Sequence, residues 1–159
     1  TSRRQRQMCI RDSHCNWVRL RDRKSGAEFR VLDIHLDHKS DDARREQMKM
    51  IVGECAQYAD GFPQIICGDF NSGIENAPVA CLRDAGWQEA YEAVHGPGEA
   101  GFTYHGFKGP DYRKKNARRI DFIFVRGNLQ PVAAEILRDK VDGLYPSDHY
   151  FLMSDFIIQ

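Results

Sequence analysis

The sequence predicts an α/β domain over residues 14–159, and three observations support this prediction. Two segments near the start alternate apolar and polar residues, as strands with one buried face do. A capped pattern with helical spacing follows them, and a short, nearly continuous apolar run then suits a buried strand. At 159 residues the chain is long enough to enclose one hydrophobic core.

The first predicted element is a β-hairpin. Its strands are Asn16–Arg23 and Glu28–Leu36, and both alternate apolar and polar residues. Gly26 lies between them and gives the backbone the freedom that a tight turn needs. At its end the second strand carries a polar cluster, made of Asp33, His35, Asp37 and His38.

A helix is expected next, with an N-cap at Ser40 or Asp41 and an end near Ala59, before Asp60-Gly61. Apolar residues at helical spacing predict a side that faces the core: Met48, Ile51, Val52 and Cys55.

The third predicted element is the short apolar run Pro63–Cys67, which is typical of a central strand buried on both faces. It leads directly into Gly68-Asp69-Phe70-Asn71-Ser72-Gly73. A short helix over about Ala77–Ala85 follows and ends at Gly86.

Three further strands are expected in the second half of the chain: Arg119–Arg126, Val132–Leu137 and His149–Ile158. In the first of them, Phe122 and Phe124 lie on one face and Asp121 on the other. A charge in so apolar a strand needs a partner.

The composition argues against a uniformly basic protein and against a membrane-spanning one. Lys and Arg together number 23, as do Asp and Glu, so any surface that binds anions must be local. No apolar run approaches the roughly 20 residues that cross a bilayer, so no membrane span is expected. The five cysteines form no Cys-x-x-Cys pair, and their odd number favours a reducing compartment such as the cytoplasm.

Residues 1–13 differ from the rest, because they carry four arginines and neither apolar periodicity nor a secretory signal. Residues 3–12 resemble one reading frame of a transposon-based sequencing adapter. We therefore expect residues 1–13 to be a non-native or disordered tail, and the natural sequence to continue upstream with other residues. A missing signal peptide then says nothing about localisation.

Polar residues gather near the predicted strand ends, where ligands bind to α/β sheets. Each one alone has a plain structural explanation as a cap or a solvated loop residue. Several carboxylates, an amide and imidazoles are costly to gather without a metal ion or an anionic ligand. The set suits phosphoester hydrolysis, in which carboxylates hold Mg²⁺ or position water and other groups stabilise the phosphoryl oxygens.

Four motifs, in order, resemble the deoxyribonuclease I-like endonuclease/exonuclease/phosphatase superfamily: Ile34-His35-Leu36-Asp37-His38, Gly68-Asp69-Phe70-Asn71, Arg119-Ile120-Asp121-Phe122-Ile123-Phe124-Val125 and Ser147-Asp148-His149-Tyr150. The resemblance covers about residues 16–159 and is closest to bacterial members of the deadenylase-like branch. It implies the C-terminal half to two thirds of a four-layer α/β/β/α sandwich. It also implies hydrolysis that depends on Mg²⁺, with Mn²⁺ as a substitute, of a phosphodiester or phosphomonoester in a nucleic acid, nucleotide or phosphorylated small molecule.

The resemblance also implies roles for single residues. Asp69 would orient or deprotonate the attacking water, and Asn71 would hold Asp69 and contact the phosphate. His149, paired with Asp121, would bind the phosphate and shuttle a proton. His35 would donate to a phosphoryl oxygen, and Asp148 would ligate the metal ion.

The chain departs from the family pattern before His35. The family's first half supplies an Asn and a metal-ligating Glu from strand ends, whereas Asn16 and Glu28 here belong to the hairpin. We therefore expect the isolated polypeptide to lack a metal carboxylate and to be nearly inactive. Open sheet edges and an uncovered apolar face would also make it poorly stable.

A basic stretch precedes the Asp121 strand and contains Arg113, Lys114, Lys115, Arg118 and Arg119. It is either a solvated loop or a guide for a phosphate-bearing substrate. The aromatic rings of Tyr104 and His105 lie just upstream and either stack on a substrate or pack within the loop. The candidate substrate-binding residues are Tyr104, His105, Lys114, Lys115 and Arg119.

Two other readings stay open. Asp33-x-His35-x-Asp37-His38 resembles the metal motif of dinuclear zinc hydrolases of the metallo-β-lactamase type, with its first His replaced. That fold leaves the Gly-Asp-Phe-Asn, Arg-Ile-Asp and Ser-Asp-His motifs unexplained. The other reading is an inactive fragment that only binds phosphate.

Overall fold

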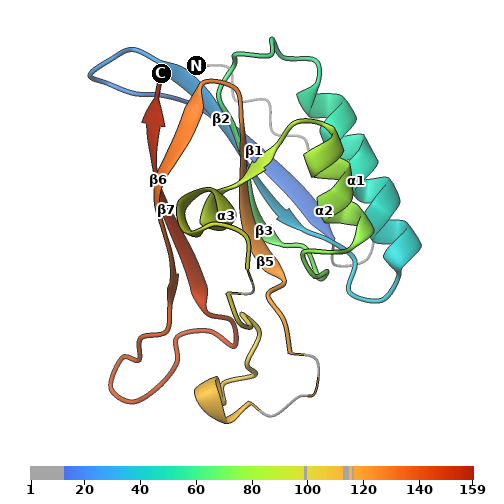
Figure 1. Ribbon diagram of the computed structural model, residues 1–159, viewed down its shortest axis with the longest axis vertical. Coiled ribbons are helices and arrows are strands. Elements are labelled where there is room, and N and C mark those ends of the chain that lie inside the picture. The colour runs from blue at the N-terminus through green and yellow to red at the C-terminus, as the bar shows by residue number, and fades with distance from the viewer. Residues whose placement is uncertain (1–12, 99, 113–114, 116) are drawn as a thin grey trace.

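The computed structural model describes residues 13–98, 100–112, 115 and 117–159 (Figure 1). The elements are β1 (His14–Arg21), β2 (Glu28–His35), α1 (Asp41–Cys55), β3 (Gln64–Asp69), α2 (Ala77–Asp84), β4 (Gln88–Glu89), α3 (Ala90–His95), the 3-10 turn η1 (Gly109–Asp111), β5 (Asp121–Arg126), β6 (Leu129–Leu137) and β7 (Phe151–Ile158).

Five strands form the larger sheet, in the order β1-β2-β3-β5-β4. β1 and β2 are the predicted hairpin, and α1 connects β2 to its parallel neighbour β3. β5 returns antiparallel to β3 on its other side. This order makes β3 the central strand, as predicted. Its burial differs from the prediction, because Gln64 and Ile66 on one face are buried whereas Ile65 and Cys67 on the other are only half-buried.

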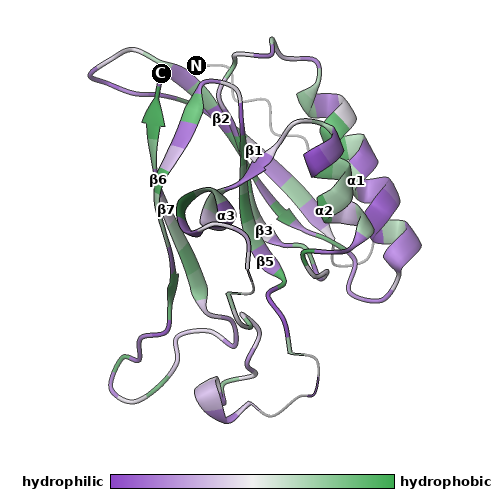
Figure 2. Ribbon diagram, viewed as in Figure 1, coloured by the Kyte–Doolittle hydropathy of each residue, from purple (hydrophilic) through white to green (hydrophobic). Residues whose placement is uncertain are grey.

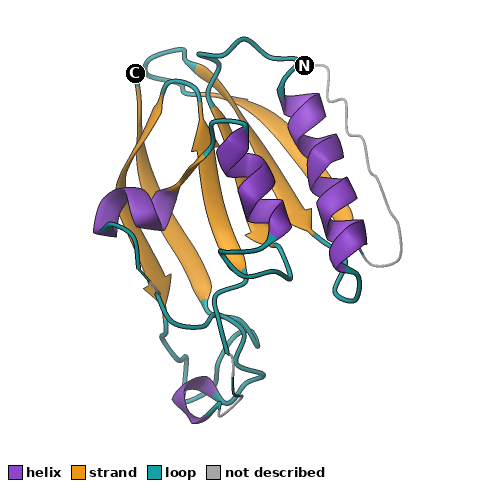
Figure 3. Cartoon of the chain, turned by 45° about the vertical axis from the view of Figure 1, so that its right-hand side comes forward, coloured by secondary structure: helices purple, strands orange, loops and turns teal. Residues whose placement is uncertain are grey.

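Helices α1 and α2 cover one face of this sheet (Figure 3). Apolar residues run along β3 and β5, whereas the outer side of α1 is hydrophilic (Figure 2). The core lies between the helices and the sheet, and its fully buried side chains include Leu32, Met48, Ile66, Phe70, Phe122 and Phe124.

A second, two-stranded sheet of β6 and β7 lies beside β5, with α3 packed near β6 (Figure 1). The described residues thus form a helix layer, a large sheet and a small sheet, and the predicted α/β class is confirmed. Among these residues, no helix has the length and apolar character that spanning a membrane requires.

Some element boundaries differ from the sequence prediction. Helix α1 ends at Cys55 instead of Ala59, because Gln57 and Tyr58 form turns that donate to carbonyls three residues back. The ring of Tyr58 then stacks on the Arg30 guanidinium, 4.7 Å away. The short elements β4 and α3 were not predicted, because two and six residues are too few to show a periodicity.

The expected tail at residues 1–13 lies outside the described residues except for Ser13, which is buried.

Candidate active site

Strand register brings four polar residues into one row across the large sheet, at the end where β2 and β3 have their carboxyl termini. His14 pairs with His35, His35 with Asp69, and Asp69 with Asp121, across β1, β2, β3 and β5. The Nε2 atom of His35 lies 3.6 Å from Oδ2 of Asp69. Three predicted catalytic residues from separate motifs are therefore neighbours.

The turn after β3 determines where the Asp69 carboxylate points. The Asn71 backbone N–H donates to Asp69 Oδ1 at 2.7 Å, and the Asn71 side-chain amide donates to the Leu36 carbonyl at 3.0 Å. Asn71 has φ 48°, a left-handed conformation that asparagine adopts more readily than most residues. Asn71 thus holds Asp69 through its backbone, while its side chain ties the turn to the end of β2.

His149 reaches the same site from the segment before β7. Its Nδ1 lies 2.9 Å from Oδ2 of Asp121, so the predicted partner of Asp121 is present. Thr103 fixes both sides of this pair: its hydroxyl accepts from the N–H groups of Ile120 and Asp121 at 3.1 and 3.3 Å, and its carbonyl accepts from Tyr150 at 2.9 Å. Buried Thr103 is a site residue that the sequence analysis missed.

The charges in the site perturb one another. Burial raises the pKa of Asp69, and the nearby Asp121 carboxylate raises it further. The pKa of His149 is raised, chiefly by its hydrogen bond with Asp121. The site therefore combines a partly desolvated carboxylate with an imidazole that stays protonated to higher pH than a free one.

Asp69, Asp121 and His149 each offer a ligand atom for a metal ion, and these atoms lie within 4.8 Å of one another. Two carboxylates suit a hard cation such as Mg²⁺, and a cation would offset their mutual repulsion. His149 could be a ligand only as a neutral imidazole, and its raised pKa narrows the pH range in which it is neutral. The donor set present here thus fits a divalent cation in part, through its carboxylates.

Asp148, the residue assigned to the metal from the sequence, is outside this cluster. Its backbone carbonyl accepts from the N–H groups of His105 and Gly106, at 2.8 and 3.1 Å. These bonds hold the chain that carries His149 against the loop after Thr103. The role of the Asp148 carboxylate as a metal ligand stays a prediction.

The predicted substrate-binding residues differ from one another in exposure: some are at the surface and others are buried. Tyr104 is exposed at the site, with its ring centroid 5.1 Å from that of His149. Lys115 is exposed, and Lys114 lies outside the described residues. His105 is buried between the rings of Tyr145 and Tyr150, which corrects its assignment to substrate contact.

The assignment of Arg119 to substrate binding is also corrected. Its guanidinium is buried and forms two hydrogen bonds with the Glu89 carboxylate, at 3.3 and 3.2 Å. The rings of Tyr91 and Phe122 lie near it, at 5.1 and 4.7 Å. Arg119 therefore anchors the chain two residues before Asp121, and only the tertiary structure identifies Glu89 as its partner.

The dinuclear zinc motif does not assemble among the described residues. Asp37 accepts from the backbone N–H groups of Lys39 and Ser40, at 2.8 and 2.7 Å, and so stabilises the turn before α1. Asp33 is exposed and lies 3.7 Å from His14, and His38 is exposed as well. Of the proposed zinc ligands, only His35 lies beside the acidic residues.

Comparison with known proteins agrees with this geometry. A model described as the endonuclease/exonuclease/phosphatase family matches residues 7–149. No curated protein matches the sequence.

Solved structures share the fold. A functionally unknown conserved protein from Enterococcus faecalis is 26% identical, with a TM-score of 0.79, and the match covers 92% of this chain and 56% of that one. A mannosyl-6-phosphatase from Bacteroides thetaiotaomicron is 22% identical with a TM-score of 0.77, and the match covers 91% and 57%. The human Nocturnin catalytic domain with bound sulfate is 22% identical with a TM-score of 0.75, and the match covers 93% and 54%. The chain thus spans little more than half the length of these structures.

Proposed function

Because the chain belongs to the endonuclease/exonuclease/phosphatase family, we propose that its protein hydrolyses a phosphoester by metal-assisted attack of water. The observation that carries the proposal is the convergence of His35, Asp69, Asp121 and His149 at one sheet edge. The family includes both phosphatases and nucleases, and the bond cleaved is either a phosphodiester or a phosphomonoester.

In this proposal Asp69 receives the proton of the attacking water. Its raised pKa brings it closer to the range in which a carboxylate is an effective base. The Asn71 N–H fixes one carboxylate oxygen, which leaves the other oriented toward the substrate. His149 is held by Asp121 through Nδ1, so its Nε2 is left to donate to a phosphoryl oxygen. His35 donates from the other side of Asp69.

A divalent cation, which we propose to be Mg²⁺, would be held by Asp148, so that Asp69 stays available as the base. When bound, it would neutralise charge on the phosphoryl oxygens. We propose that the isolated chain is impaired, because the metal-ligating Glu of the family has no counterpart before His35 in this sequence. The substrate is a nucleic acid, a nucleotide or a phosphorylated small molecule.

The test uses the longest natural product of the locus that encodes these residues, with the 159-residue chain beside it. Bis-p-nitrophenyl phosphate and p-nitrophenyl phosphate are assayed with Mg²⁺, Mn²⁺, Zn²⁺ or EDTA. We expect a rate that requires Mg²⁺ or Mn²⁺, and a loss of about 10²–10⁴-fold in kcat for Asp69→Ala.

Activity with Zn²⁺ and none with Mg²⁺ would favour the dinuclear zinc reading instead. A longest product that binds inorganic phosphate but hydrolyses neither ester under any metal would identify a phosphate-binding protein.

A further inference from the structure

Arg118 is an exposed cation without a partner, whereas most other arginines among the described residues are paired. No hydrogen bond or ion pair joins its side chain to another residue of the described chain, and among the described arginines only Arg23 shares this state. Neighbouring Arg119 is fully engaged with Glu89. Arg118 is therefore the arginine of the basic stretch that the described structure leaves free to bind an anion.

The Arg118 side chain lies against the backbone of Gly73. A Cβ atom at Gly73 would be 2.7 Å from Cδ, 3.0 Å from Nε and 3.5 Å from Cζ of Arg118. Gly73 is buried and does not have a positive φ, so its backbone conformation alone does not demand glycine. Because Gly73 has no side chain, the Arg118 side chain has room to lie against its backbone.

This contact places Arg118 against the turn that follows Asp69 and Asn71. Gly73 follows Asn71 by two residues, so their Cα atoms are at most about 7.6 Å apart. The Phe70 N–H donates to the Ile120 carbonyl at 2.9 Å, so the two segments run side by side where Asp69 and Asp121 pair.

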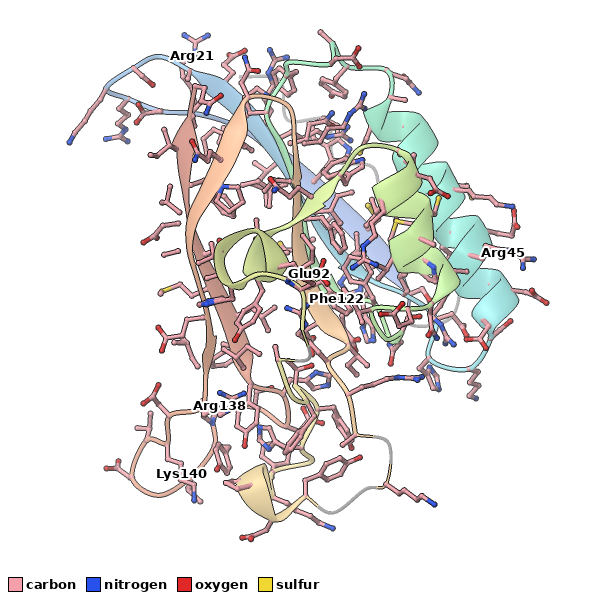
Figure 4. The ribbon with its side chains drawn as sticks, in the orientation of Figure 1. Arg21, Arg45, Glu92, Phe122, Arg138 and Lys140 are labelled. Carbon is pink, nitrogen blue, oxygen red and sulfur yellow. The ribbon has the colours of Figure 1, made fainter. Side chains whose placement is uncertain are left out.

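Two other cations near the loops are occupied elsewhere. Arg138 donates to the Ala100 carbonyl and lies over the Tyr150 ring, and Lys140 lies over the Tyr145 ring. Figure 4 shows both below β6, on the opposite side of the molecule from Arg45 on α1.

We propose that Arg118 binds a second phosphate of the substrate, next to the ester that is hydrolysed. This inference rests on the proposed function, because it places the scissile phosphate between Asp69 and His149. A guanidinium matches a phosphate with two parallel hydrogen bonds, and it stays charged at any working pH. The preferred substrate class is then a bisphosphorylated or polyphosphorylated compound.

The test measures binding without catalysis, in metal-free buffer, by calorimetry on the longest natural product of the locus, with the 159-residue chain beside it. Two ligand pairs differ by one phosphate: AMP against adenosine 3′,5′-bisphosphate, and glucose 6-phosphate against glucose 1,6-bisphosphate. We expect at least one bisphosphate to bind about tenfold more tightly than its monophosphate. The pair that shows the preference distinguishes a nucleotide from a sugar phosphate.

Variants connect the preference to Arg118. Arg118→Gln should abolish it, and Gly73→Ala should weaken it, because the added methyl group displaces an arginine that is still present. The control is Arg23→Gln, which removes an equal charge from the β1–β2 turn at the far end of the hairpin. It should keep the preference.

Two results would overturn the inference: equal affinity for both members of each pair, or an unchanged preference in Arg118→Gln. Its failure is distinguishable from failure of the proposed function. Hydrolysis with no Arg118-dependent preference refutes only the second-phosphate site. An Arg118-dependent preference in a longest natural product that hydrolyses no phosphoester refutes only the hydrolase.

Discussion

Gly68 and Asn71 show how single residues position the Asp69 carboxylate. Gly68 has φ 132°, and a Cβ atom there would overlap with the Ile34 carbonyl of the neighbouring strand. The glycine lets β3 approach β2 closely just before Asp69. Asn71 then takes the left-handed conformation that returns its N–H to Asp69.

We predict that Gly68→Ala lowers the free energy of unfolding by about 3 kcal/mol or more, because strained backbone and overlap combine. Urea unfolding followed by circular dichroism measures the change. The control is Gly53→Ala in α1, where a Cβ atom meets nothing within 4 Å. It should stabilise the chain by about 0.5–1 kcal/mol. A Gly68→Ala variant as stable as wild type would show that β2 and β3 can separate freely.

The pairing of His149 with Asp121 predicts a pH dependence. The hydrogen bond raises the pKa of His149, so its stabilising effect is complete below the unfolded pKa and is lost as pH rises through the folded pKa. Asp121→Asn also relieves the repulsion that raises the pKa of Asp69. The lost hydrogen bond destabilises the variant mainly at low pH. The relieved repulsion stabilises it mainly at high pH, where Asp69 is charged. Both effects therefore make the variant lose more stability at pH 5.5 than at pH 9.

The measurement is urea unfolding at these two pH values, with an NMR titration of the His149 ring to confirm a lower pKa in Asp121→Asn. The control is Asp142→Asn, an exposed residue with φ 52°, which asparagine tolerates. An equal loss of stability at both pH values in Asp121→Asn would contradict the pairing.

At the scale of elements, one buried ion pair joins α3 to the start of β5. Glu89 accepts from the Glu92 N–H at the beginning of α3 and also binds Arg119. The pair therefore connects two elements whose sequences gave no sign that they meet.

We predict that Arg119→Ala costs about 3–5 kcal/mol of stability, because it leaves the Glu89 carboxylate buried and unpaired. The double variant Arg119→Met, Glu89→Leu should be more stable than this single variant, since no charge is then left behind. The control is the more exposed pair of Arg83 and Glu92, 2.8 Å apart, where Arg83→Ala should cost less than about 1 kcal/mol. Thermal unfolding of all three variants gives the comparison, and equal losses for Arg83→Ala and Arg119→Ala would contradict it.

For the whole molecule, the outward side of the small sheet remains uncovered. Alternate residues of β6 and β7 expose large apolar side chains there, with exposed fractions of 42–51%: Val132, Phe151, Met153 and Ile157. Val18 and Leu20 on β1 are exposed as well. Exposed apolar side chains that gather on one sheet face favour association.

We predict that Phe151→Ser combined with Ile157→Thr reduces self-association of the chain, measured by light scattering and sedimentation velocity over a range of concentrations. The control is Leu144→Ser, which removes an exposed leucine from the turn between β6 and β7. It should change association little, because Leu144 is not part of the sheet face. An equal effect of both substitutions would indicate that total apolar exposure, and not this face, drives association.

The sequence by itself determined the α/β class, most strands and helices of the chain, and the family. It also predicted His35, Asp69, Asn71, Asp121 and His149 as site residues, because their motifs are local and each stands at a strand end or turn. The sequence predicted that these residues lie near strand ends, but not which residues pair across the strands. That pairing places His35, Asp69 and Asp121 in one row.

Only the tertiary structure decided how the basic stretch divides. Arg118 and Arg119 are adjacent in sequence and equal in charge, but one lies exposed over Gly73 and the other is buried against Glu89. Burial and partners depend on contacts between distant segments, which local patterns do not contain. For the same reason the sequence left open whether His105 stacks on a substrate or packs within the loop, whereas the structure encloses it between two tyrosines.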